Sequence, residues 1–511
     1  MRVNETPAYP RPAWFWRFAD QIERFPILGL LLAGMVYTLL LRSVFDVDIF
    51  WQLKLGDLTL DEGRIPPTEP FVLPEGRPHV PIGWLAQVIY ALARRVGGWQ
   101  LAQVVDTAAW LGGLAAIAFS VRSRMPRAWP AAAALWIVFL VAASQASLRP
   151  QSFALLSFGL LFALVKSDWA LWKKVIFGGL ILVLWSNTHP SVVSGGAYLG
   201  VLAAVGWGKF LWTRTGRPPW TSTLLMPIAV GTLFATPAGA DLISVAAYNA
   251  EICLKLDIVN TGEWRGLWDT EAIRRWNAGD WDGLWNWLSG TARVWAAVLL
   301  AITFVALLIR GRRVPLEDIA AAVLFAVLMI LTYRFVLFWT AVLIPVWAAI
   351  LAPSRPLPAP PRRVPGYWFI LSVAFALAIA VAMLTKPSVL AEYLPIKGAE
   401  AMKKEGVRGT IYSHFEWGGV LADGGYPDWK LTHDGRYYLL SESEWREHFA
   451  ALDGQIPVED LERKYRPVAF FLRPGWGDAL IEKLRVNPRW REVPSDENSA
   501  VFVRTTTEPR P

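Results

Sequence analysis

The chain has 511 residues, 29 of them tryptophan; 54% of its residues are hydrophobic and 18% are charged, and the mean hydropathy is +0.34. This composition excludes an ordinary soluble domain and predicts a polytopic α-helical membrane protein. The net charge of +8 does not come from a basic patch with interleaved aromatic residues, so nucleic acid is not an expected partner.

The first apolar run, residues 26–45, is long enough to cross a hydrocarbon core of about 30 Å as a helix. It is too long for a signal-peptide core and follows a polar stretch rich in proline and arginine, so we expect a retained helix. The arginines before it predict that residues 1–25 are cytoplasmic. Asp46 and Asp48, directly after the run, then face the outside.

Residues 46–98 form the predicted first outer loop. Its stretch between the first span and residue 81 is rich in proline and polar residues, as at 66–70, and predicts an ordered loop with turns. Within 81–96, apolar residues recur at steps of three and four, which predicts an amphipathic helix along the membrane surface. Arg94 and Arg95 at its end are then placed to contact lipid phosphates.

Ten further apolar runs complete a predicted transmembrane region, residues 26–386, of eleven spans. With this count, every Lys/Arg cluster between spans except the pair Arg94 and Arg95 is cytoplasmic. The second large outer loop, 239–291, carries six tryptophans, which either anchor it at headgroup level or line a sugar or lipid site. The further runs are 99–121, 130–147, 150–166, 172–188, 191–212, 221–238, 292–310, 316–333, 334–352 and 366–386.

Residues 387–511 have the composition of a soluble domain and follow the last span on the outside. Strand-like runs alternate with helical runs, which predicts a small α/β domain with turns at 424–425 and 434–435. The expected strands are 410–413, 468–472 and 500–503, and the expected helices are 442–452, 458–465 and 477–484.

Polar residues of the spans gather at the outer membrane level. Ionisable groups at membrane depth are costly and usually face a bundle interior or a wet cavity, so a shared level predicts a joint site. Solvated carboxylates, an interfacial histidine and a snorkelling arginine would explain each residue separately. A cluster of His414, Glu416 and His433 in the soluble part lacks convincing metal-ligand spacing. The candidate residues are Asp46, Asp48, Arg149, Gln151, Asn187, His189 and Arg334.

The chemistry that would use this set is transfer of a group from a lipid-phosphate donor. A carboxylate can accept the proton of an attacking hydroxyl, while cations stabilise the leaving phosphate. The D-x-D spacing alone is weak evidence. Two nearby carboxylates are compatible with a divalent cation, Mg or Mn, but do not require one.

The stretch Asp46-Val-Asp-Ile-Phe-Trp-Gln-Leu-Lys-Leu-Gly56 resembles the first outer loop of a large group of bacterial membrane glycosyltransferases of the GT-C type. Later landmarks resemble the same group along nearly the whole chain. Departures from its pattern are Gln52 where histidine is common, Pro190-Ser191 where Gly-Gly is common, and Thr236 where asparagine is common. The other matching segments are 63–66, 81–86, 148–151, 185–189, 236–239, 263–264, 416–419 and 434–436.

The resemblance implies a bacterial inner-membrane enzyme that uses a polyprenyl-phosphate-sugar donor, inverts the transferred sugar and has its catalytic carboxylate in the first outer loop. Asp46 or Asp48 would be the base, with Asp48 the first choice. The implied donor-phosphate ligands are Arg149, Gln151, Asn187, His189 and Arg334, and the implied sugar or acceptor contacts are Trp51, Glu263 and Trp264.

We therefore expect a glycosyltransferase that modifies a glycan, lipid or protein acceptor outside the membrane, with the C-terminal domain holding or selecting that acceptor. The main rival is a catalytically inactive GT-C-like subunit that binds or assembles a protein complex. A third alternative is a lipid-linked glycan carrier or flippase. Such a carrier would need polar residues throughout the bundle, whereas they gather at one level.

Overall fold

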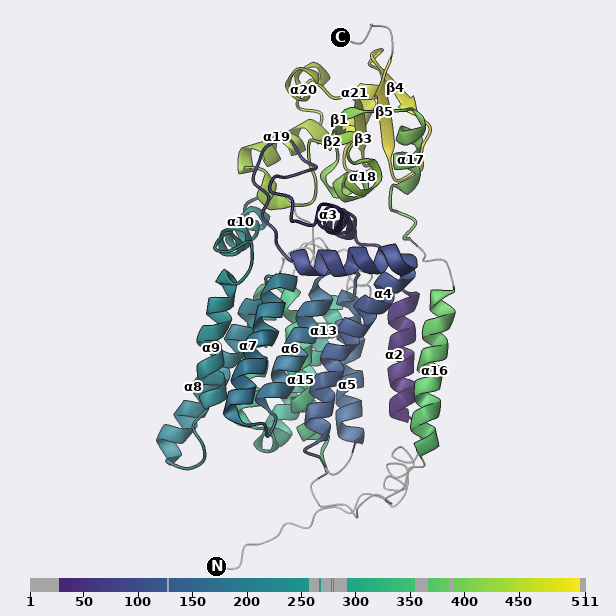
Figure 1. Ribbon diagram of the computed structural model, residues 1–511. Helices are drawn as coiled ribbons and strands as arrows, with labels where there is room; N and C mark the ends of the chain where they lie inside the picture. The colour runs from purple at the N-terminus through teal and green to yellow at the C-terminus, as the bar shows by residue number, and fades with distance from the viewer. Residues whose placement is uncertain are drawn as a thin grey trace, which may run out of the picture.

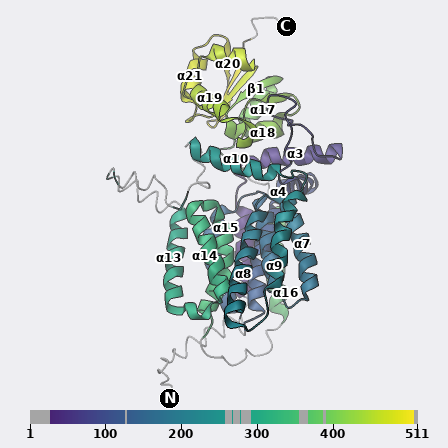
Figure 2. The ribbon, with the colours of Figure 1, turned by 90° about the vertical axis from the view of Figure 1, so that its left-hand side faces the viewer.

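The computed structural model describes residues 27–125, 128–256, 266–267, 277, 279, 292–353, 366–385 and 390–505. A body of roughly parallel helices carries a C-terminal region built around a sheet (Figure 1). Helix α3 and the first half of α4 lie between these two parts and run across the ends of the body helices. Seen from the side, α10 lies in the same layer (Figure 2).

An α-helix overlaps each apolar run that the sequence predicts as a span. Within the described residues, three helical segments are long and apolar enough to cross a membrane: Trp84–Arg122, Ala292–Arg313 and Tyr333–Leu351. The body helices are α2 (Ile27–Leu41), α4 (Trp84–Arg122), α5 (Trp129–Ala142), α6 (Gln151–Val165), α7 (Leu171–Thr188), α8 (Val192–Thr213), α9 (Trp220–Gly231), α13 (Ala292–Arg310), α14 (Leu316–Leu331), α15 (Val336–Leu351) and α16 (Gly366–Leu384), and α10 (Asp241–Lys255) follows α9.

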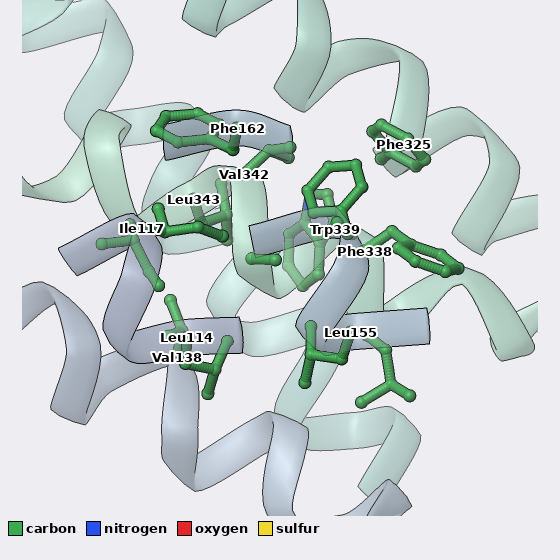
Figure 3. Close-up of a cluster of buried hydrophobic side chains, with 14 of the residues drawn as sticks. Leu114, Ile117, Val138, Leu155, Phe162, Phe325, Phe338, Trp339, Val342 and Leu343 are labelled. Atoms are coloured by element: carbon green, nitrogen blue, oxygen red, sulfur yellow. The ribbon is translucent and has the colours of Figure 1, made fainter. Parts of the chain in front are cut away.

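The core of the body is aromatic where α6, α14 and α15 meet. Phe325, Phe338 and Trp339 lie together in it (Figure 3), and the rings of Phe325 and Phe338 are 5.9 Å apart. Helices α4 and α6 touch backbone to backbone, since a Cβ on Gly113 would lie 2.2 Å from the carbonyl oxygen of Leu155. Small residues permit such close approach between helices. This contact fixes the start of α6 against α4.

Helix α4 bends sharply at two glycines. Gly98 has φ 64° and ψ −162°, a conformation that favours glycine, and Gly97 is also non-helical. The half before the bend runs across the body and the half after it enters the body (Figure 1), as the amphipathic pattern predicts. Arg94 and Arg95 both form ion pairs with Asp57, at 2.6 Å in each case, and their contact with lipid phosphates stays a prediction.

The first outer loop contains a helix, α3 (Asp48–Glu62), where we expected only ordered loop and turns. Ile49, Phe50 and Leu53 are buried on one side of this helix, and Gly63 ends it in the left-handed conformation with φ 65°. Helix α3 packs on α4 and on α18 of the C-terminal region. Packing against α4 and α18 therefore stabilises α3, a short helix that cannot span a membrane.

The C-terminal region is a five-stranded mixed sheet with strand order β2-β1-β3-β5-β4. Strands β2, β1 and β3 are parallel, and β5 is antiparallel to β3 and β4. The predicted strands and helices are present. Strands β2 and β4 were not predicted. The expected turn at Gly424 and Gly425 is wrong, because these residues end helix α18. The elements are α17 (Ile396–Lys404), β1 (Gly409–Ser413), α18 (Gly418–Gly425), β2 (Trp429–Leu431), α19 (Glu442–Leu452), α20 (Val458–Tyr465), β3 (Ala469–Leu472), α21 (Asp478–Arg485), β4 (Trp490–Val493) and β5 (Ala500–Arg504).

The first outer loop extends the edge of this sheet. The amide of Leu431 in β2 donates to the carbonyl of Phe71 at 2.8 Å, and the amide of Leu73 donates to Leu431 at 2.9 Å. The loop after α2 and the C-terminal region are therefore joined by backbone pairing as well as by side chains.

Candidate functional site

Asp46 and Asp48 lie at the junction of α2 and α3 but differ in exposure. Asp46 is buried, and its Oδ1 accepts a hydrogen bond of 2.9 Å from the amide of Asp48 at the start of α3. The side chain of Asp48 is 33% exposed, and its Oδ1 accepts a hydrogen bond of 3.2 Å from Nε1 of Trp51. Asp46 thus supports the local fold, and Asp48 is the carboxylate that an external molecule can reach.

Arg149 connects the two carboxylates. It precedes α6, forms an ion pair with Asp46 through Nε, and places Nη2 3.6 Å from Oδ2 of Asp48. The structure therefore brings together three residues that the sequence placed at one level. The guanidinium group supplies positive charge directly beside the exposed carboxylate.

His189 and Arg334 lie on the same side of the body as Arg149. His189 follows α7 and is buried, and Nδ1 of its ring accepts a hydrogen bond of 3.1 Å from the amide of Ser191. This bond leaves the ring proton on Nε2. Arg334 in the short helix η4 (Tyr333–Phe335) and Arg149 both interact electrostatically with the His189 ring. Both arginines are thus within electrostatic range of His189.

The other predicted residues have different positions. Oδ1 of Asn187 accepts a hydrogen bond of 2.8 Å from Nε1 of Trp84, and its Nδ2 donates to the carbonyls of Val183 and Ala235. These bonds tie α7 to the start of α4, which is a structural role. Gln151 is the first residue of α6. Glu263 and Trp264 lie outside the described residues.

A second polar network, which the sequence analysis missed, holds Arg149 in place. The hydroxyl of Tyr90 lies 2.5 Å from Oδ1 of Asp106 and 2.9 Å from the carbonyl oxygen of Arg149, and Asp106 forms an ion pair with Arg42. Tyr90 lies before the bend in α4 and Asp106 lies after it, so their contact connects the two halves of this helix. The sequence signal that could have identified this network is Asp106, a charged residue inside a predicted span. In the structure this carboxylate is fully buried.

The C-terminal region packs directly on the carboxylates through two glycines. A Cβ on Gly419 would lie 2.3 Å from the carbonyl oxygen of Val47, and a Cβ on Gly435 would lie 2.9 Å from Oδ1 of Asp48. At Gly419 only a residue without a side chain permits this approach to the backbone, whereas at Gly435 an added Cβ would displace the end of the Asp48 side chain. The two C-terminal motifs that resemble GT-C landmarks therefore meet the first outer loop at the candidate site.

Arg436 lies at the centre of this contact and is buried. Its Nη1 and Nη2 each donate to Glu69 at 2.7 Å, and its Nε donates to Asp434 at 2.8 Å. Burial raises the pKa of Glu69, but the charge of Arg436 and the hydrogen bonds from Arg436, His79 and the amide of Phe71 together outweigh burial and hold that pKa far below its usual value. The guanidinium group also lies over the ring of Trp51, 5.1 Å from its centroid.

Among the described residues, no group of three or more His, Cys, Asp or Glu side chains is arranged to hold a metal ion. His414 and His433 belong to a buried aromatic cluster in the C-terminal region, in which the rings of His433 and His448 stack at 3.8 Å. Glu416 forms an ion pair with Arg473.

The fold is similar to that of membrane glycosyltransferases of known structure. The structure is similar to that of the oligosaccharyltransferase AglB from Archaeoglobus fulgidus in complex with an inhibitory peptide and a dolichol-phosphate, with a TM-score of 0.55 and 9% identity over 97% of this chain and 75% of AglB. It is also similar to the arabinofuranosyltransferase AftD from Mycobacteria, with a TM-score of 0.50 and 13% identity over 96% of this chain and 40% of AftD. The chain thus has the fold of GT-C membrane glycosyltransferases.

A second AglB structure, tethered to an acceptor peptide, gives a TM-score of 0.54 at 10% identity over 97% of this chain and 75% of that chain. No protein-family profile matches the sequence, and no curated protein matches it by sequence similarity. The similarity of this chain to GT-C glycosyltransferases is therefore a similarity of fold.

Proposed function

We propose that the protein is a bacterial inner-membrane glycosyltransferase that moves a sugar from a polyprenyl-phosphate donor to an acceptor on the outer side of the membrane. Eleven spans place the N-terminus in the cytoplasm and the C-terminal region outside. The observation that carries the proposal is the exposed carboxylate of Asp48 beside the guanidinium group of Arg149, on a GT-C fold. The acceptor is a glycan, a lipid or a protein.

In the proposed reaction, Asp48 accepts the proton of the acceptor hydroxyl as its oxygen attacks the anomeric carbon. The bond from that carbon to the phosphate oxygen breaks, so the sugar is transferred with inversion and the polyprenyl phosphate leaves with the bonding electrons. Arg149, His189 and Arg334 stabilise the charge on the departing phosphate. Asp46 holds Arg149 and the start of α3, and Trp51 orients Asp48.

A divalent cation, Mg or Mn, bound between the two carboxylates would compete with Arg149, because this arginine already lies beside both of them. We infer that the positive charge of Arg149 takes the place that a metal has in other transferases. Transfer in the presence of a chelator should therefore equal transfer without it. A dependence on added Mg or Mn would contradict this inference.

The proposal is tested with the purified full chain and labelled polyprenyl-phosphate sugars. Asp48→Asn should lower transfer by about 10²–10⁴-fold, the range for loss of a general base, while thermal unfolding stays at the wild-type midpoint. Asp61→Asn is the matched control, because Asp61 lies on the same helix and its side chain is 62% exposed. This control should retain full transfer.

Two results would count against the proposal. Full transfer by Asp48→Asn would remove Asp48 as the base. Folded, monodisperse protein that transfers no sugar from any common donor, and that copurifies with a stable partner, would favour the alternative of an inactive binding or assembly subunit.

A further inference from the structure

A cavity of about 500 Å³ lies at the end of the helical body that is far from Asp48. Three helical segments, Trp84–Arg122, Ala292–Arg313 and Tyr333–Leu351, have their C-terminal ends there, and in the described part of the chain these are the segments long and apolar enough to cross a membrane. The cavity is therefore at a boundary between hydrocarbon and water, whichever way the chain is oriented.

The lining of this cavity combines apolar and cationic residues. Val121, Phe162 and Ala349 are among its apolar residues, while Arg124 and Arg313 supply two guanidinium groups from elements far apart in the sequence. The carbonyl oxygen of Ala352 accepts a hydrogen bond of 3.1 Å from Arg313, and that of Lys166 accepts one from Arg124. Helix ends thus hold both arginines at the cavity.

One carboxylate, Asp318, also lines the cavity, but Lys166 forms an ion pair of 2.8 Å with it. Lys166 lines a second cavity of about 320 Å³ together with Lys209 and Arg217. The acid of that cavity, Glu317, lies 3.7 Å from Lys209. Both cavities therefore keep an excess of positive charge.

We propose that the larger cavity binds an anionic phospholipid of the bilayer. The phosphate group lies between Arg124 and Arg313, since guanidinium groups bind phosphate in a bidentate manner. The acyl chains follow the apolar wall formed by Val121, Phe162 and Ala349. Basic pockets between spanning helices are suited to anionic headgroups for this reason. The inference rests on the proposed membrane placement and not on the proposed reaction.

The test measures thermal unfolding of the purified full chain in a neutral detergent, with added phosphatidylglycerol, phosphatidylcholine or inorganic phosphate. Phosphatidylglycerol should stabilise the wild type, at a concentration about tenfold lower than phosphatidylcholine needs. The double substitution Arg124→Gln and Arg313→Gln should remove this preference. Arg312→Gln is the matched control, because Arg312 lies in the same turn as Arg313 and is exposed like Arg124 and Arg313, but does not line the cavity.

Equal stabilisation by phosphatidylcholine, or an equal loss of preference in Arg312→Gln, would overturn the proposal. Stabilisation by inorganic phosphate alone, without a preference for the lipid, would also overturn it. If the double variant does not fold, Arg313→Lys serves in its place. It keeps the charge but loses bidentate binding, so its preference for phosphatidylglycerol should be weaker than that of the wild type.

Discussion

Two clusters in this molecule have the same composition, two carboxylates and one arginine, but differ in what they can do. Asp46, Asp48 and Arg149 form the first. Glu69, Asp434 and Arg436 form the second, which is buried throughout. In the second cluster each carboxylate accepts hydrogen bonds from the guanidinium group. The comparison shows that exposure, and not residue type, separates a candidate reaction centre from a structural joint.

Trp51 connects the two clusters. Its Nε1 donates to Asp48, and its ring lies beneath Arg436. The buried cluster therefore supports the orientation of the exposed one. On this account the C-terminal region is part of the candidate site and not only a surface that holds an acceptor.

The largest expected effect on stability comes from Arg436→Met. This change leaves two buried carboxylates without their cation, a loss that typically costs about 3–5 kcal/mol. Thermal or denaturant unfolding followed by tryptophan fluorescence would measure it. The control is Arg463→Met, whose side chain is 79% exposed and pairs with Asp460; it should change stability by less than about 1 kcal/mol. Equal effects of both substitutions would show that the buried cluster is not a joint.

An intermediate effect is expected from acid, through the buried histidines. Burial lowers the pKa of His448 to about 3 from an ordinary value of 6.5. Above pH 6.5 the His448 ring is neutral in both the folded and the unfolded protein. Below pH 6.5 this ring binds a proton in the unfolded protein but not in the folded protein, so stability is lost as pH falls. At pH 5 the loss from this one group is ~2 kcal/mol. Unfolding midpoints between pH 7.5 and 5 would measure it.

His448→Phe keeps a ring at this position but cannot titrate, so its unfolding midpoint should fall less steeply between pH 6.5 and 5. The neighbouring His414 and His433, whose pKa values burial also lowers, still contribute. A variant profile parallel to that of the wild type would contradict a role for His448 in the acid response.

The smallest effect on stability is expected from Gly435→Ala. The added Cβ would lie 2.9 Å from the flexible end of Asp48, which can move away, so the cost should be below about 1 kcal/mol. Transfer should nevertheless fall by about tenfold or more, because a displaced catalytic group loses alignment. Gly424→Ala is the control, since nothing lies within 4 Å of its Cβ position. Similar transfer by the two variants would show that contact with Gly435 does not position Asp48.

Much of the helical body was predictable from the sequence, because apolar runs of this length have few alternatives to helices. The short helix α3 was not predicted, since its stability depends on burial against α4 and α18. Strand β2 was missed for a similar reason. It has three residues and is completed by pairing with Phe71 and Leu73 of the first outer loop.

The candidate site was predictable in part. Charge at one membrane level identified Asp46, Asp48 and Arg149, which the structure brings together. The pairing of Glu69 with Arg436 was beyond the sequence, because the residues are 367 positions apart and neither lies in a periodic pattern. Asp106 could have been identified from its charge inside an apolar run.

Chemical labelling tests the claim that Asp48 is the reachable carboxylate of the two clusters. The folded protein is treated with a water-soluble carbodiimide and an amine, and the modified carboxylates are identified by mass spectrometry. Asp48 should be labelled well before Asp46, Glu69 and Asp434, which should react only after unfolding. Labelling of Glu69 or Asp434 as rapid as that of Asp48, or protection of Asp48 in the folded protein, would contradict the claim.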